Sequence, residues 1–167
     1  MKHLFSILLA GSISITIIHS GYAQTGGGIL LPIRNAGADG ASIKATGHFW
    51  NTFGESKNEK WYPLPNGFLA EFTEKSVQVK VVYNKKGSWV YTIRQYTEKE
   101  LPGEIRAQVK QTYYDDTIGV VKEVIQPQST VYLIHIENGV RWKTIRVRDG
   151  EMEVVQDFKI SPVQGAK

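Results

Sequence analysis

Residues 59–89 read EKWYPLPNGFLAEFTEKSVQVKVVYNKKGSW, and this stretch decides the fold because its pattern returns later in the chain. The echo covers residues 122–152, where a charged pair is again followed by apolar strand segments and a glycine turn. Gly87 and Gly150, which occupy equivalent places in the two copies, lie 63 residues apart (87 to 150). A unit of this length indicates a duplicated supersecondary module, because solenoid repeats are shorter.

Apolar residues within each copy alternate with polar ones. Val77, Val79, Val81 and Tyr83 alternate with Gln78 and Lys80 in the first copy, and in the second Tyr132, Ile134 and Ile136 alternate with Leu133 and His135. A period of two predicts antiparallel strands that are buried on one face. Turn-forming pairs separate these segments, and we expect hairpins at each of them: Asn66-Gly67, Lys86-Gly87 and Asp149-Gly150.

A helical segment precedes each set of strands. From about Ala41 to Glu55 we expect one apolar stripe, although Gly47 weakens the helix; its members are Ile43, Phe49, Trp50 and Phe53. The second helix is predicted to have Pro102 at its first position and Glu104 in its first turn, and its apolar residues recur at helical spacing: Ile105, Val109 and Tyr113.

The sequence therefore predicts an α+β fold, a tandem repeat of one helix followed by an antiparallel meander of about four strands. The helices are expected to pack on one face of the sheet, because the strands alternate with a period of two. The two repeats are expected at about 41–96 and 101–158, within one domain spanning 41–160.

The first residues predict export. A positive residue, Lys2, precedes an apolar stretch at 4–18, and Gly21-Tyr22-Ala23 places small residues before a cleavage site, so 1–23 is predicted to be a signal peptide. We expect a periplasmic or extracellular location after cleavage near Ala23. Residues 24–40 are rich in glycine and are predicted to be a flexible arm, and 161–167 a tail.

Composition excludes several classes of site. The chain has no cysteine, so disulfides and thiolate chemistry are excluded. Its formal net charge is +4, with basic and acidic residues interleaved, and this pattern does not favour nucleic-acid binding. No second segment is apolar enough to predict a transmembrane helix.

The chain resembles the secreted bacterial PepSY-like proteins that are described as similar to beta-lactamase-inhibitor proteins. The resemblance covers roughly 45–158 and depends on the order and spacing of its residues. These are Phe53, Lys60-Trp61, 67–72, Val81-Val82-Tyr83, Gly87-Ser88-Trp89, Arg94, Tyr96, Leu101-Pro102, Ile105, Tyr113-Tyr114, Tyr132 and Asp149-Gly150.

This resemblance implies a tandem helix-and-sheet fold whose sheets present a surface to a partner. It implies no catalytic residue and no cofactor. The disulfides of true lactamase inhibitors cannot form here, because this chain has no cysteine.

Strand alternation identifies candidate binding residues. If Ile145 and Val147 point into the core, Trp142 and Arg146 lie on the opposite face. Lys80 and Gln78 occupy the corresponding strand of the first repeat, and these four residues are the predicted partner-binding site. The alternative for Trp142 is that it covers the sheet to protect an edge. Trp61, next to the first hairpin, is predicted to be core.

Enzymatic interpretations find little support. His48 and His135 follow no known catalytic or zinc-binding spacing, and Asp115-Asp116 lacks the further oxygen ligands of a calcium loop, so these aspartates are predicted to form a turn. Gly26-Gly27-Gly28 has no following lysine and is interpreted as linker. The sequence predicts no catalytic residue and no metal site.

Three functional classes follow. The first is a non-catalytic exported envelope protein that binds a protein or peptide through its sheet, with inhibition as one form of that binding. The second is a small-ligand or glycan-binding module that uses exposed aromatic residues. The third is a hydrolase, which would depend on His135 or Asp116.

Overall fold

The structure is a computed structural model that describes residues 41–160, apart from 55 and 57. The predicted signal peptide (1–23), glycine-rich arm (24–40) and tail (161–167) lie outside the described residues. Across the described range, none of the helices combines the length and the apolar character that crossing a bilayer requires.

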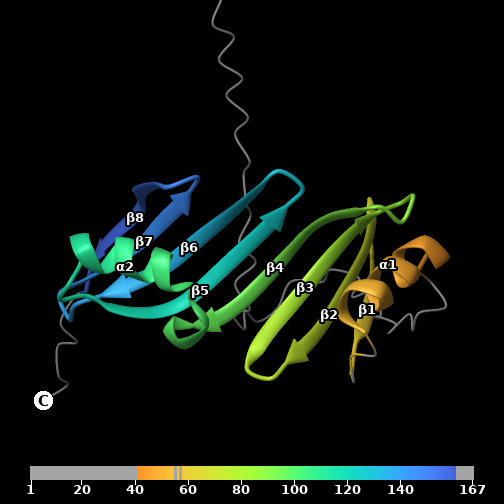
Figure 1. Cartoon of the computed structure of the whole chain (residues 1–167), viewed down its shortest axis with the longest axis horizontal. Helices are drawn as coiled ribbons and strands as arrows, with labels where there is room; N and C mark the ends of the chain where they lie inside the picture. Colours follow the sequence, from red (N-terminus) through yellow and green to blue (C-terminus); the bar gives the residue numbers. More distant parts are fainter. Residues whose placement is uncertain (1–40, 55, 57, 161–167) are drawn as a thin grey trace, which may run out of the picture. The chain divides into compact units, whose positions relative to one another are not determined.

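The described chain forms one sheet of eight strands, and the strands follow one another in chain order (Figure 1). Every neighbouring pair is antiparallel. The elements are α1 (Ile43–Phe53), β1 (Lys60–Leu64), β2 (Gly67–Glu74), β3 (Val77–Asn84), β4 (Trp89–Thr97), the 3₁₀ helix η2 (Glu98–Glu100), α2 (Gly103–Thr112), β5 (Thr117–Gln126), β6 (Ser129–Glu137), β7 (Arg141–Arg148) and β8 (Glu151–Lys159). The predicted order, one helix and four strands repeated, is confirmed.

Helix α1 begins and ends at the residues that its sequence favours. The Ser42 hydroxyl accepts a hydrogen bond from the Ala45 backbone N–H at 3.2 Å, which caps the first turn. Gly54 ends the helix with a φ of +68°, a conformation that glycine adopts without steric cost. Gly47 is tolerated inside the helix.

The predicted stripe of α1 was wrong in two of its four members. Ile43 is 91% exposed and Trp50 is 49% exposed. The buried side instead runs through Ala45, Phe49 and Phe53, which are spaced four residues apart and therefore lie above one another on one side. Phe49 contacts Trp61 and Phe72 with ring centroids 5.4 and 5.3 Å apart.

Helix α2 repeats this arrangement in the second half. Pro102 was predicted at the first helical position but is the N-cap residue, one position earlier, and Glu104 lies in the first turn as expected. Val109 is fully buried, and Ile105 and Tyr113 pack against the core. Both helices contact the same side of the sheet, because Phe49 packs on β2 and the Tyr113 ring lies 5.0 Å from the Lys143 ammonium on β7.

The turns are largely as predicted, with one shift. Asp149 and Gly150 form the two-residue loop between β7 and β8, with φ values of 50° and 81°. Between β1 and β2, however, the loop is Pro65-Asn66, because Leu64 pairs with Gly67. Gly67 is needed for another reason: a Cβ at this position would lie 1.8 Å from the Tyr83 carbonyl oxygen on β3.

The core lies between the helices and the sheet, and we call this side the helix face. Its buried residues come from both repeats, including Trp61, which is 3% exposed as predicted; the others include Ala70, Phe72, Val79, Val81, Tyr96, Val121, Ile134, Ile145 and Val147. Strands β4 and β5 pair from Thr92↔Ile125 to Thr97↔Val120 and so join the two repeats in one sheet.

Candidate functional site

The face of the sheet opposite to α1 and α2, which we call the far face, carries the residues that alternate with the core. Its cross-strand register forms rows that run perpendicular to the strands. One row crosses all eight strands and consists of Lys60, Glu71, Lys80, Ile93, Val124, Val131, Arg148 and Glu151. The next row consists of Thr73, Gln78, Gln95, Lys122, Leu133, Arg146 and Glu153.

The composition of the first row changes from its ends to its middle. Its outer positions are charged, whereas the three central ones, Ile93, Val124 and Val131, are aliphatic and half-buried. Val120, on the same side of β5, is 45% exposed. The middle of the far face is therefore an apolar strip with charged ends, which is the arrangement found in protein interfaces.

The four predicted binding residues divide into two pairs. Gln78 and Arg146 do lie in the same row, but β4, β5 and β6 separate them. Four steps of about 4.8 Å place β3 and β7 roughly 19 Å apart. One small molecule does not bridge this distance, whereas a protein surface does.

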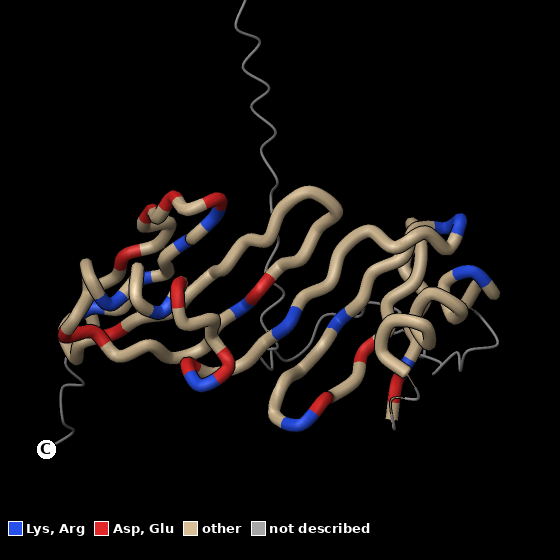
Figure 2. Tube along the Cα trace, in the orientation of Figure 1, with Lys and Arg blue, Asp and Glu red and all other residues tan. Residues whose placement is uncertain are grey.

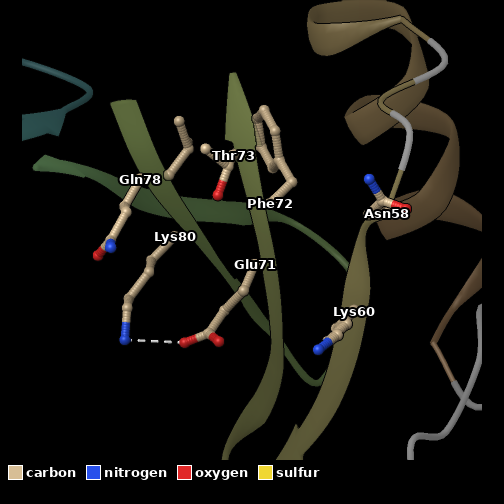
Figure 3. Close-up of a pocket in the computed structure, with 8 residues that line it drawn as sticks. Asn58, Lys60, Glu71, Phe72, Thr73, Gln78 and Lys80 are labelled. Atoms are coloured by element: carbon tan, nitrogen blue, oxygen red, sulfur yellow. Dashed lines mark ion pairs between the residues drawn. The ribbon is translucent and has the colours of Figure 1, made fainter. Parts of the chain in front are cut away.

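Gln78 and Lys80 line a shallow pocket of about 400 Å³ at the β1–β3 end of the sheet (Figure 3). The Lys80 ammonium lies 2.8 Å from a Glu71 carboxylate oxygen, and both side chains are partly exposed. Figure 3 shows Lys60 on the neighbouring strand. The pocket wall is therefore mostly polar and carries charges of both signs, with Phe72 and Val79 as its apolar members.

Trp142 and Arg146 lie on the far face of β7, whereas Ile145 and Val147 on the same strand are buried on the helix face. The alternation predicted from the sequence is therefore confirmed. Trp142 is half-buried. Its ring stacks on Phe158 with the ring centroids 4.4 Å apart, and the His135 ring lies beside it with a centroid distance of 5.2 Å. Arg146 pairs with Glu153 on β8. The Trp142 side chain thus shares its surface with two neighbours and is not an isolated anchor.

A second polar cluster lies on the helix face, where the two repeats meet. Glu123 is 7% exposed, and it accepts hydrogen bonds from Arg94 at 2.9 Å and from the Tyr96 hydroxyl at 3.0 Å. Burial, followed by the neighbouring Glu123 charge, raises the pKa of Tyr96 and of Tyr132 above the usual range. These phenols therefore stay protonated, and the cluster satisfies a buried carboxylate.

The described histidines and the buried Asp116 lie apart from one another. His135 lies on the far face beside Trp142, whereas Asp116 is buried on the helix face, 3.5 Å from the Lys143 ammonium. His48 is on α1, where its Nδ1 is 3.1 Å from the Tyr83 hydroxyl. No group of three or more potential metal ligands occurs among residues 41–160 as described.

Charges of both signs are spread along the strands and turns, as Figure 2 shows. Sequence reasoning located two pairs of far-face residues but did not identify the apolar strip between them. The sequence does contain a sign of this strip, because Val120, Lys122 and Val124 are every second residue of one strand and so share a face. Which residues of β4 and β6 flank them depends on the strand register.

Comparison with known proteins shows that this chain is similar in fold to several solved structures. No family model matches the sequence, and no curated protein matches it. Among solved structures, a BLIP-like protein from Bacteroides fragilis has a TM-score of 0.56 and 13% sequence identity, over 76% of this chain and 92% of that chain. A DUF2874 family protein from Bacteroides uniformis has a TM-score of 0.55 and 14% identity, over 74% of this chain and 92% of the other.

A third structure, from Bacteroides eggerthii, carries the description "putative periplasmic proteins". Its TM-score is 0.54 at 17% identity, over 72% of this chain and 89% of that chain. The resemblance predicted from residues 45–158 is confirmed as a likeness in fold: this chain has the fold of the DUF2874 and BLIP-like structures.

Proposed function

We propose that this protein is a non-catalytic exported protein that binds a protein partner through the far face of its sheet. The observation that carries the proposal is the row from Lys60 to Glu151, which crosses all eight strands and is apolar only in its middle. The aliphatic centre supplies buried area, and the charged ends supply orientation.

The size of the far face fits a protein partner. Seven steps of about 4.8 Å make the row roughly 34 Å long. A standard interface buries about 800 Å² on each partner, which a patch of that width accommodates. By contrast, the pocket at Gln78 and Lys80 lies at one end of the sheet, and only Phe72 and Val79 of its eight lining residues are apolar, whereas sites for drug-sized ligands are predominantly apolar.

The fold neighbours support this proposal in two ways. One is described as BLIP-like, and this makes inhibition of an enzyme one form that the binding could take. The Bacteroides eggerthii structure is described as one of "putative periplasmic proteins", and this agrees with the export that residues 1–23 predict.

Affinity capture tests the proposal with matched variants. The full chain, Val124→Arg and Trp142→Ala would each be used to capture proteins from an extract of the cells that make the protein. Ala107→Arg is the control, because it adds the same charge on the exposed side of α2. We expect a partner that the wild type and Ala107→Arg capture equally and Val124→Arg does not. Equal capture by all variants would remove the far face from the proposal.

A glycan-binding function is the second candidate. The observation that favours it is the stacked pair of Trp142 and Phe158, because Phe158 is 49% exposed and presents an aromatic surface. A thermal-shift screen with soluble glycans tests it, since a ligand that binds the folded state raises the midpoint of unfolding. No shift with any glycan, together with capture of a protein partner, would exclude this candidate.

A further inference from the structure

Lys122 is a lysine in the middle of the apolar strip. It projects from β5, one of the two central strands, and lies between Gln95 and Leu133 across the sheet. Along β5 its far-face neighbours are Val120 and Val124. Directly opposed side chains lie about 5 Å apart and diagonal ones about 7–8 Å apart, so Ile93 and Val131 are also within reach of its stem.

Lys122 differs from most other cations in the two far-face rows, which are paired; among the described residues Lys60 also has no ion pair, but it lies on the edge strand β1 at the charged end of its row. Lys80 pairs with Glu71, Arg146 with Glu153 and Arg148 with Asp149. Within the part of the chain that the structure describes, Lys122 forms no ion pair. Glu71 and Glu153 are each three strands from β5, roughly 14 Å away.

This arrangement determines what can cover the strip. In the free protein we expect the aliphatic stem of Lys122 to lie along its apolar neighbours with the ammonium in water, as long cationic side chains commonly do. A partner that buries the valines also removes water from that ammonium. An uncompensated buried charge opposes binding strongly, so an apolar surface alone does not suffice.

We propose that the partner presents a segment with a carboxylate flanked by apolar side chains, and that the carboxylate pairs with Lys122. This inference rests on the proposed function of the far face. Surrounded by aliphatic side chains, the ion pair would be shielded from water, which is the environment in which interface residues contribute most to affinity. Lys122 would then select acidic partners, because a neutral or basic segment leaves one or two charges unpaired.

A library of random linear peptides displayed on phage tests the inference, with the full chain as bait. The variants are Lys122→Met, which keeps the stem and removes the charge, and Lys122→Glu, which reverses it. Lys85→Glu, in the exposed turn after β3, is the charge control. Circular dichroism of each variant checks the fold, and Lys122→Met keeps the test valid if the charge reversal prevents folding.

We expect the wild type and Lys85→Glu to select peptides with Asp or Glu between apolar residues. Lys122→Met should lose the acidic preference and bind a selected peptide at least about tenfold more weakly, whereas Lys122→Glu should select Lys or Arg at that place. One outcome would overturn this inference and leave the proposed function standing. In it, the selected peptides lack acidic residues, bind Lys122→Met as well as the wild type, and do not bind Val124→Arg. Selection that Val124→Arg does not change would overturn both.

Discussion

Lys122 and Glu123 are neighbours in sequence, but strand alternation places them on opposite faces of β5. Glu123 faces the helices, is 7% exposed and has two hydrogen-bond donors, Arg94 and Tyr96. Lys122 faces away from the helices and lies among aliphatic side chains. At the scale of single residues, the first is therefore part of the folded structure, and the second is the candidate for recognition.

Loss of Arg94 tests the structural role of the buried cluster. We expect Arg94→Met to lower the free energy of unfolding by about 2 kcal/mol, because it leaves the Glu123 carboxylate buried without its cation. This value allows for the partial exposure of the Arg94 side chain. The double variant Arg94→Met/Glu123→Leu should recover part of the loss, since no charge stays buried. Urea denaturation measures both, and a double variant less stable than the single one would contradict this explanation.

The buried phenols predict a loss of stability in alkali. Burial raises the pKa of Tyr83 above its usual value of about 10. A group whose pKa is raised on folding contributes stability that is complete below its unfolded pKa and is lost as the pH rises above it. We therefore expect the free energy of unfolding to fall above about pH 10, and to fall less steeply in Tyr83→Phe. The control is Tyr114→Phe, because Tyr114 is 76% exposed; equal slopes for both variants would refute the assignment.

The element scale begins with α1, whose attachment to the sheet depends on one aromatic residue. Phe49 is fully buried among Phe53, Trp61 and Phe72. We expect Phe49→Ala to cost about 3–4 kcal/mol, because it removes buried area and leaves a cavity. Trp50→Ala, one residue further on the exposed side, should cost less than about 0.5 kcal/mol. Chemical denaturation compares the two, and similar losses would show that α1 is attached differently.

The hairpin between β1 and β2 supplies a second prediction at this scale. We expect Gly67→Ala to destabilise the protein by several kcal/mol, on the order of 3, because its Cβ would meet the β3 backbone. Gly103→Ala at the start of α2 is the matched control, since the space around it is empty and its effect should be about zero or slightly stabilising. Thermal unfolding of both variants measures the difference. Two equal midpoints would mean that β2 and β3 do not approach this closely.

The elements also show how far the sequence could predict the structure. The alternation in β3 and β6 predicted both strands and their buried sides, because a period of two is a local property of the chain. The predicted stripe of α1 was wrong at Ile43 and Trp50. Large apolar residues occur on both the exposed and the buried side of this helix, so hydrophobicity alone did not identify the buried side. The surroundings of Lys122 could not be predicted, because they depend on Gln95 and Leu133, which only the register of three strands brings together.

At the scale of the whole molecule, the joining of the two repeats in one sheet forms the surface that we propose for binding. Each repeat buries one side of four strands beneath its own helix, and the pairing of β4 with β5 continues the sheet from one repeat into the other. The apolar strip includes residues of β4, β5 and β6, so it contains residues from both repeats. Neither repeat alone carries it, and binding through the far face therefore requires the joined sheet.

Site-specific photocrosslinking in the cells that make the protein tests the central claim most directly. A benzophenone amino acid would replace Val124 at the centre of the far face and, in a second variant, Ala107 on the exposed side of α2. Recognition through the far face predicts a discrete crosslinked protein from position 124 and none from position 107. The same crosslinked protein from position 107, with none from position 124, would contradict it.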